Sequence, residues 1–198
     1  MKSYSKPNIL LIMTDQQSYS MMSCTGNPYL STPAMDSIAA SGTRFDRAYC
    51  TNPVCMPSRF SMITGRMPRY IGLKTNSADF EWSMLDKIKA EGFGWVLREA
   101  GYDTAYGGKV HLPALGPNQV GMEYITKDER DGLAEACVEY IMQDSDKPFM
   151  LVASFINPHV ICFKAIMDFS EEEDARKFFV NCRTEIETLE KAMRYPDG

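Results

Sequence analysis

Two short, uninterrupted apolar runs constrain the fold of this chain more than any other feature. They span Asn8–Met13 and Lys147–Phe155. Both are shorter than a typical helix, and a continuous apolar run that does not alternate with polar residues indicates a strand buried on both faces. Strands of this kind occur mainly in parallel sheets covered by helices. The runs therefore predict an α/β fold with a mostly parallel sheet flanked by helices.

Polar residues follow each run at the point where the predicted strand ends. Asp15 comes after the first run, and Asn157-Pro158-His159 comes after the second. In open α/β sheets, ligands bind beyond the carboxyl ends of the strands. Asp15 is therefore a candidate ligand for a hard cation, although an aspartate that caps a turn is an equally good interpretation. His159 is either a functional imidazole or a structural loop histidine, and the two readings weigh about evenly.

The stretch from Gly101 to His111 predicts a short strand that runs into a Gly107-Gly108 turn. Glycines let the backbone approach a ligand closely, and residues two apart on an extended chain point the same way. Lys109 and His111 would then present a cation and an imidazole to one spot, which suits an oxyanion. The alternative is a surface lysine beside an incidental histidine.

A helix is predicted to begin at Cys55, because Pro57 suits a first helical turn and Gly65 provides a stop. Free backbone N–H groups and the helix dipole make such an N-terminus a site for anions. Arg59 would project one turn later on nearly the same face. The alternative is a buried structural cysteine with a solvated arginine, since free cysteine commonly behaves as a small core residue.

The remaining periodic segments read as scaffold. Residues 33–41 predict a short helix, residues 84–100 predict one helix or two pieces interrupted by glycines, and residues 128–142 predict a helix that packs on the core. Residues 171–195 predict a long amphipathic helix whose apolar stripe needs a partner surface.

Composition excludes several classes of protein. A net charge of -5 with dispersed basic residues argues against a nucleic-acid-binding or anionic-membrane surface. The six cysteines form no C-x-x-C pair, which favours a reduced state. No apolar signal core or membrane-length run is present, so we expect a cytoplasmic chain, or a periplasmic or secreted one if a signal peptide has been removed.

Four elements, in this order along the chain, resemble the N-terminal part of the sulfatases of the alkaline phosphatase superfamily. They are Pro7-Asn8 with the apolar run to Asp15, Cys55-Met56-Pro57-Ser58-Arg59 with Thr64-Gly65, Gly101-Tyr102 to Gly108-Lys109-Val110-His111, and Asn157-Pro158-His159. The resemblance implies an alkaline phosphatase/sulfatase-like fold that is incomplete on its C-terminal side. Residues 1–198 would be the N-terminal part of a sulfatase-like catalytic domain.

The resemblance also implies the chemistry of a sulfuric ester hydrolase. A maturation enzyme would convert Cys55 to formylglycine, whose hydrate attacks sulfur and later expels sulfate. Asp15 and the modified Cys55 would bind a divalent cation, with Ca²⁺ as the first choice and Mg²⁺ or Mn²⁺ as alternatives. The substrate would be a small-molecule or glycan sulfate ester.

By the same resemblance, each remaining motif residue has a catalytic role. Arg59 would steady the formylglycine, and Lys109 would bind sulfate oxygens. His111 would be the base that releases the sulfated intermediate, and His159 would contact sulfate or protonate the leaving alcohol.

Some features depart from the family pattern. Gln16 stands where many members have a second aspartate, which leaves its role as a ligand open, and Met56 and Gly107 are unusual in their signatures. The family's later Asp-Asn or Asp-His metal pair and a further sulfate-binding lysine are missing. A phosphonate or phosphate ester hydrolase with the same modified cysteine, and a non-catalytic fragment, therefore stay as alternatives.

Overall fold

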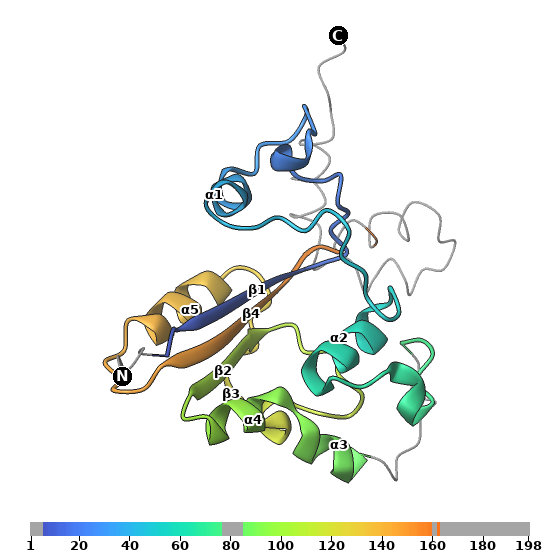
Figure 1. Cartoon of the computed structure of the whole chain (residues 1–198), viewed down its shortest axis with the longest axis vertical. Coiled ribbons are helices and arrows are strands. Elements are labelled where there is room, and N and C mark those ends of the chain that lie inside the picture. Colours follow the sequence, from blue (N-terminus) through green and yellow to red (C-terminus); the bar gives the residue numbers. More distant parts are fainter. Residues whose placement is uncertain (1–5, 77–84, 160–161, 163–198) are drawn as a thin grey trace, which may run out of the picture.

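The computed structural model describes residues 6–76, 85–159 and 162 (Figure 1). Its sheet contains four strands that all pair in parallel, in the order β1-β4-β2-β3. The strands are β1 (Ile9–Asp15), β2 (Asp103–Gly108), β3 (Glu123–Thr126) and β4 (Phe149–Pro158). β1 and β4 coincide with the two apolar runs, so the predicted parallel α/β sheet is confirmed. The sequence did not predict β3, because its four residues are too few to show a period.

The helices are α1 (Pro33–Ser41), α2 (Cys55–Thr64), α3 (Leu85–Glu91), α4 (Phe93–Glu99) and α5 (Leu133–Ile141), with short 3-10 turns between them. The segment 84–100 forms two pieces that separate at Gly92. α5 begins later than the predicted residue 128, because the Asp128 carboxylate accepts hydrogen bonds from the backbone N–H groups of Arg130 and Gly132 and forms a turn. The helix predicted over residues 171–195 lies outside the described residues.

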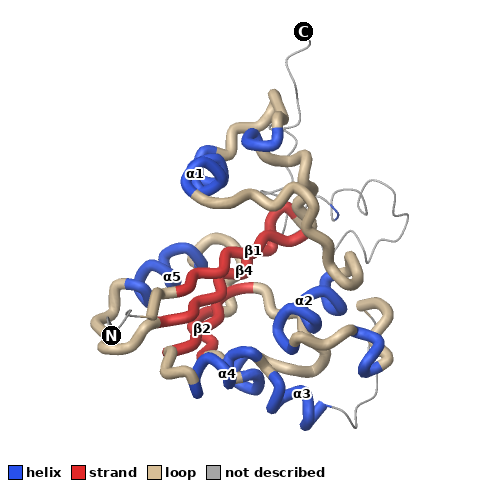
Figure 2. The backbone as a smooth tube through the Cα atoms, in the orientation of Figure 1, coloured by secondary structure: helices blue, strands red, loops and turns tan. Residues whose placement is uncertain are grey.

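Helices cover both faces of the sheet (Figure 2). One face carries Tyr106 and Val152, which pack with Phe60 and Ile63 of α2. The opposite face carries Ala105, Leu151 and Ala153, which pack against Leu133 and Cys137 of α5. None of the helices in the described ranges is long and apolar enough to cross a membrane.

β1 departs from the prediction of a strand buried on both faces. Leu11 and Met13 pack into the core on the α2 side. Leu10 and Ile12 point the other way and are 45% and 52% exposed. They pair in register with Leu151 and Ala153 of β4, which α5 covers, but β1 is the outermost strand of the described sheet and α5 does not extend over it. The prediction is therefore wrong for one face of β1.

Candidate active site

The carboxylate of Asp15 is the point at which three separated segments meet. It ends β1 and is only 6% exposed. Its Oδ2 atom lies 2.5 Å from Lys109 Nζ and 3.3 Å from Arg59 Nη2. Its Oδ1 atom accepts a hydrogen bond from Cys55 Sγ at 3.4 Å. The structure therefore brings together four of the residues that the sequence singled out.

The charges around Asp15 decide its ionisation and that of Cys55. Burial alone would raise the pKa of Asp15, but the hydrogen bond and charge of Lys109, followed by the charge of Arg59, outweigh burial and hold the pKa below its usual value. Burial raises the pKa of the Cys55 thiol, and the neighbouring Asp15 carboxylate raises it further. Cys55 is therefore a neutral thiol at neutral pH.

Cys55 is the first residue of α2, as the sequence predicted. Pro57 lies in the first turn, and Gly65 ends the helix with a φ of 67°. The backbone N–H of Met56 donates to Asn76 Oδ1 at 2.9 Å. Asn76 thus occupies one of the N–H groups expected to bind an anion, and no pattern in the sequence pointed to it.

Arg59 is not the solvated arginine of the alternative reading, since it is 6% exposed. Its Nη1 atom donates to Ser154 Oγ at 2.7 Å and to the backbone oxygen of Lys109 at 2.8 Å. The Tyr106 hydroxyl lies 3.2 Å from the same nitrogen. Tyr106 and Ser154 lie inside strands with no polar pattern of their own, so sequence reasoning missed both.

Gln16 and His159 form a second cluster beside Asp15. Gln16 adopts a left-handed backbone with a φ of 63°. Its side-chain oxygen lies 2.5 Å from His159 Nδ1 and accepts a hydrogen bond from Cys162 Sγ at 2.8 Å. The sequence did not single out Cys162. The amide of Gln16 therefore sets the orientation of the His159 ring.

His111 also has an unusual environment. It follows β2 with a φ of 44°, and within the described part of the chain its buried Nδ1 atom has no hydrogen-bond partner. Burial, then the positive charges of Lys109 and Arg59, lower its pKa. Burial and then the charge of Lys109 lower the pKa of His159 in the same way. Both imidazoles are therefore neutral at neutral pH.

A cleft of about 700 Å³ opens over this cluster. Its lining includes Asp15, Gln16, Cys55, Asn76 and His159, but not His111. Carboxylate and amide oxygens suit a hard cation. Within the described ranges, however, no three His, Cys, Asp or Glu side chains group closely enough to hold a metal ion. The described residues thus fit part of a metal site.

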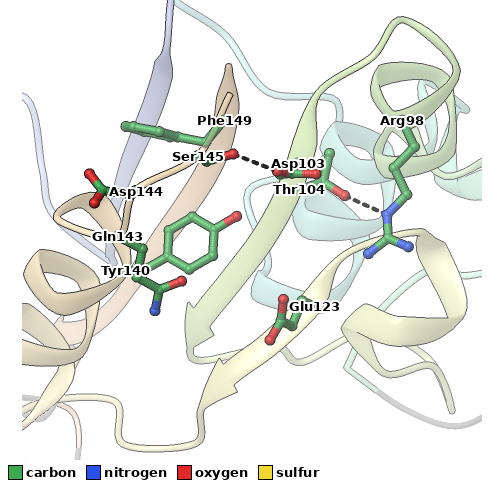
Figure 3. Close-up of a pocket in the computed structure, with 9 residues that line it drawn as sticks. All are labelled: Arg98, Asp103, Thr104, Glu123, Tyr140, Gln143, Asp144, Ser145 and Phe149. Carbon is green, nitrogen blue, oxygen red and sulfur yellow. Dashed lines mark hydrogen bonds between the residues drawn. The ribbon is translucent and has the colours of Figure 1, made fainter. Parts of the chain in front are cut away.

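A second pocket, of about 350 Å³, lies at the opposite edge of the sheet (Figure 3). Asp103, Glu123 and Phe149, which begin β2, β3 and β4, line it. Arg98 Nε donates to Thr104 Oγ1 there at 2.8 Å. This pocket contains none of the candidate catalytic or metal-binding residues, and ligands of parallel sheets bind at the other edge. The candidate active site is therefore the cleft over Asp15.

Several known proteins are similar to this chain. The family model described as Sulfatase matches residues 7–192. The uncharacterized sulfatase YidJ of Escherichia coli K12 is 37% identical over 198 residues, which cover 78% of this chain and 39% of that protein. The N-acetylglucosamine-6-O-sulfatase of Bacteroides thetaiotaomicron is 38% identical over 107 residues, or 54% of this chain and 18% of that protein.

Solved structures share the fold. One, in complex with its substrate D-glucosamine-2-N,6-O-disulfate, superposes with a TM-score of 0.65 and 26% identity over 85% of this chain and 40% of that one. The chain thus spans well under half the length of these relatives. The family match covers nearly all of its residues and includes the Asp15, Cys55, Lys109 and His159 motifs, and the chain belongs to the sulfatase family.

Proposed function

We propose that the protein of which this chain is part hydrolyses sulfate esters, and that residues 1–198 are the N-terminal part of its catalytic domain. The observation that carries the proposal is the meeting of Cys55, Arg59 and Lys109 around the buried Asp15 carboxylate. Asp15, Cys55 and Arg59 also line an open cleft. Because Lys109 and Arg59 carry two positive charges and Asp15 carries one negative charge, the cluster has a net positive charge. A positive site favours the oxygens of a sulfate group.

Cys55 is the residue to be modified in this proposal. As a neutral thiol beside a carboxylate it is a poor nucleophile. Members of the family generally use formylglycine, which would require a maturation enzyme acting on Cys55. Formylglycine at position 55 would supply a hydrated aldehyde, whose hydroxyl is an oxygen nucleophile.

The family also generally uses a divalent metal, and Asp15 and residue 55 are the proposed ligands. Ca²⁺ is the first choice because it takes about six to eight oxygen ligands, with Mg²⁺ or Mn²⁺ as alternatives. The bound cation would polarise the sulfate ester. Because the described residues contain no group of three His, Cys, Asp or Glu side chains, we expect further ligands from outside the described ranges.

The remaining residues bind sulfate and move protons. Arg59 Nη2 faces Asp15 and would steady residue 55. Lys109, whose ammonium group pairs with Asp15, is the proposed ligand of a sulfate oxygen, although it is not among the residues that line the cleft. The neutral His111 can accept a proton and suits the base. His159 lines the cleft beside Gln16, where it can contact the sulfate or the leaving oxygen.

The proposed substrate is a sulfated sugar. The cleft is open and large enough for a monosaccharide, and named relatives act on N-acetylglucosamine 6-O-sulfate and glucosamine disulfate groups. A small aryl sulfate should serve as a general probe, because a phenolate leaves more readily than the alkoxide of a sugar and its hydrolysis needs few contacts with the alcohol.

The test uses the full-length protein expressed together with a formylglycine-generating enzyme. Mass spectrometry of the peptide containing Cys55 should show conversion of thiol to aldehyde, and the protein should hydrolyse 4-nitrophenyl sulfate and glucosamine 6-sulfate. Cys55→Ala should abolish turnover, whereas Cys24→Ala, at a half-buried cysteine outside the cleft, should not. Faster turnover of an aryl phosphonate than of the sulfate esters would instead identify a phosphonate hydrolase. An unmodified Cys55 without turnover would refute the proposal.

A further inference from the structure

We propose that Tyr106 and Ser154 are positioning residues, which hold Arg59 and Lys109 in their working orientation through one shared backbone carbonyl. The inference rests on the proposed function, because it concerns the residues that would bind residue 55 and the sulfate. Neither residue was among the candidate site residues of the sequence, although Tyr106 lies within the segment from Gly101 to His111. Tyr106 lies inside β2, and Ser154 lies inside β4.

The backbone oxygen of Lys109 is the centre of this arrangement. It accepts hydrogen bonds from Arg59 Nη1 at 2.8 Å, from Ser154 Oγ at 2.8 Å and from the Tyr106 hydroxyl at 2.5 Å. Ser154 Oγ also accepts from Arg59 Nη1 at 2.7 Å. Ser154 is 0% exposed and Tyr106 is 2% exposed, so water cannot replace either hydroxyl from the surface.

These bonds fix Arg59 on one side and leave its other side for the site. Nη1 is held by the carbonyl and by the two hydroxyls, which sets the plane of the guanidinium. Nη2 is then directed at Asp15 Oδ2, 3.3 Å away. The orientation of Arg59 toward the cleft thus depends on groups that lie beneath it.

Lys109 is held by the same two strands. Its N–H donates to the Ser154 backbone oxygen at 2.8 Å, and its carbonyl accepts the three bonds described above. Gly108 makes this approach possible, because a Cβ atom there would lie 2.2 Å from the Ser154 oxygen. With its backbone fixed, Lys109 can keep its ammonium group 2.5 Å from Asp15.

The two hydroxyls have a role that apolar side chains of the same shape cannot fill. Phenylalanine and alanine would occupy the same space but would leave buried N–H groups of a charged guanidinium with fewer acceptors. Burial raises the pKa of Tyr106, so the phenol remains protonated and able to donate. We therefore expect removal of either hydroxyl to let Arg59 leave its orientation.

The test compares Tyr106→Phe and Ser154→Ala in the matured full-length protein, with 4-nitrophenyl sulfate as substrate. Each variant should lower kcat about tenfold with little change in KM, as expected for the loss of one hydrogen bond to a charged group. Thr104→Val is the matched control. Thr104 carries a buried hydroxyl, 2% exposed, on the same strand as Tyr106, and this hydroxyl donates to the backbone oxygen of Gly121. It accepts from Arg98 in the pocket at the other edge of the sheet (Figure 3). This variant should lower the Tm comparably but leave kcat unchanged.

A double-mutant cycle separates positioning from general stability. If Ser154 acts through Arg59, Ser154→Ala should lower kcat clearly less than tenfold in an Arg59→Lys background, because the bond from Arg59 to Ser154 is already lost there and only the bond from Ser154 to the Lys109 carbonyl remains to be removed. A full, additive tenfold loss in that background would overturn the inference. Parental kcat in both hydroxyl variants of an active enzyme would overturn it as well.

A readout independent of activity keeps the two proposals distinct. Exchange of the Arg59 guanidinium protons, followed by NMR, should be slow in the parent and in Thr104→Val, and clearly faster in Ser154→Ala and Tyr106→Phe. If the matured parent hydrolyses no sulfate ester, the proposed function fails and this measurement alone decides the positioning role. Unchanged exchange in both hydroxyl variants would then overturn that role.

Discussion

Replacing Asp15 with asparagine should destabilise the protein far more than replacing an exposed aspartate that has an equally close lysine partner. Asp15 pairs with Lys109 at 2.5 Å and with Arg59 at 3.3 Å, and all three side chains are less than 10% exposed. Asp86 pairs with Lys89 at 2.8 Å, but the Asp86 side chain is 93% exposed. The two substitutions are chemically identical, so a difference in the free energy of unfolding reports the burial of Asp15 together with its second cationic partner, Arg59.

The magnitude follows from the charges left behind. The wild-type cluster contains two cations and one anion, whereas Asp15→Asn leaves two buried cations with a neutral amide. Removing one partner of a buried pair typically costs about 3–5 kcal/mol, because the remaining charge stays desolvated without compensation. At Asp86 the partner lysine is solvated, and exposed pairs contribute little. We expect no measurable change in the free energy of unfolding for Asp86→Asn.

The assay is urea unfolding of the metal-free full-length protein, followed by circular dichroism. Equal stabilities of Asp15→Asn and Asp86→Asn would refute the reasoning that the Asp15 cluster is desolvated. A second variant guards against a simple folding failure: Asp15→Asn combined with Lys109→Met removes one of the two stranded cations and should recover part of the lost stability. If this double variant is less stable than Asp15→Asn, unpaired charge is not the cause.

Three further predictions concern the frame and ionisation of the site. Gly108 has a φ of 85°, and a Cβ added there would lie 2.2 Å from the Ser154 oxygen, so Gly108→Ala should sharply lower the Tm. A Cβ added at Gly116 would have its nearest neighbouring atom 3.9 Å away, so Gly116→Ala should leave the Tm nearly unchanged. Equal Tm values for the two variants would contradict the close approach at Gly108. Leu133→Ala, at a 0% exposed residue of α5, should cost about 2–5 kcal/mol by urea unfolding, and a cost below about 1 kcal/mol would show that α5 is not firmly packed on the sheet. An NMR titration of His159 should give a pKa below the ordinary value of 6.5. Because the folded state then binds this proton less readily than the unfolded chain, His159 should reduce stability as the pH falls from 6.5 through the lowered pKa. A pKa at or above 6.5 would refute the assignment.

The elements that sequence reasoning predicted well are those whose signals are local. The helix at Cys55 is set by Pro57 and Gly65, and the structure has it from Cys55 to Thr64. The parallel pairing of β1 and β4 follows from two continuous apolar runs. No local signal predicts the burial of β1, because burial depends on which elements lie beside the strand. Within residues 6–76, 85–159 and 162, Leu10 and Ile12 remain exposed.

The same distinction holds for the site. Asp15, Cys55, Arg59 and Lys109 were visible because each belongs to a short motif, and their convergence follows from the edge of a parallel sheet. Tyr106 and Ser154 could not be found in this way, because the sequence around a hydroxyl in an apolar strand does not indicate whether that hydroxyl bonds to a carbonyl or to an arginine. Only the register of β2 against β4, which pairs Tyr106 with Val152 and Gly108 with Ser154, brings these hydroxyls to Arg59.

The ionisation of Cys55 joins the geometry of the site to its chemistry. A helix N-terminus lowers the pKa of a thiol in its first turn, and this would favour a reactive thiolate. Here burial and the Asp15 carboxylate, which receives the thiol's hydrogen bond at 3.4 Å, act in the opposite direction and raise the pKa. Lys109 and Arg59 do not reverse this balance, because both lie against Asp15. A site that activates a cysteine would hold a cation next to the sulfur, whereas here the Asp15 carboxylate lies next to it. A carboxylate in that place suits the proposed oxygen nucleophile at residue 55, which would share a metal ion with Asp15. Without a metal ion, the arrangement of charges therefore keeps the Cys55 thiol neutral, which agrees with the proposal that Cys55 is the precursor of formylglycine.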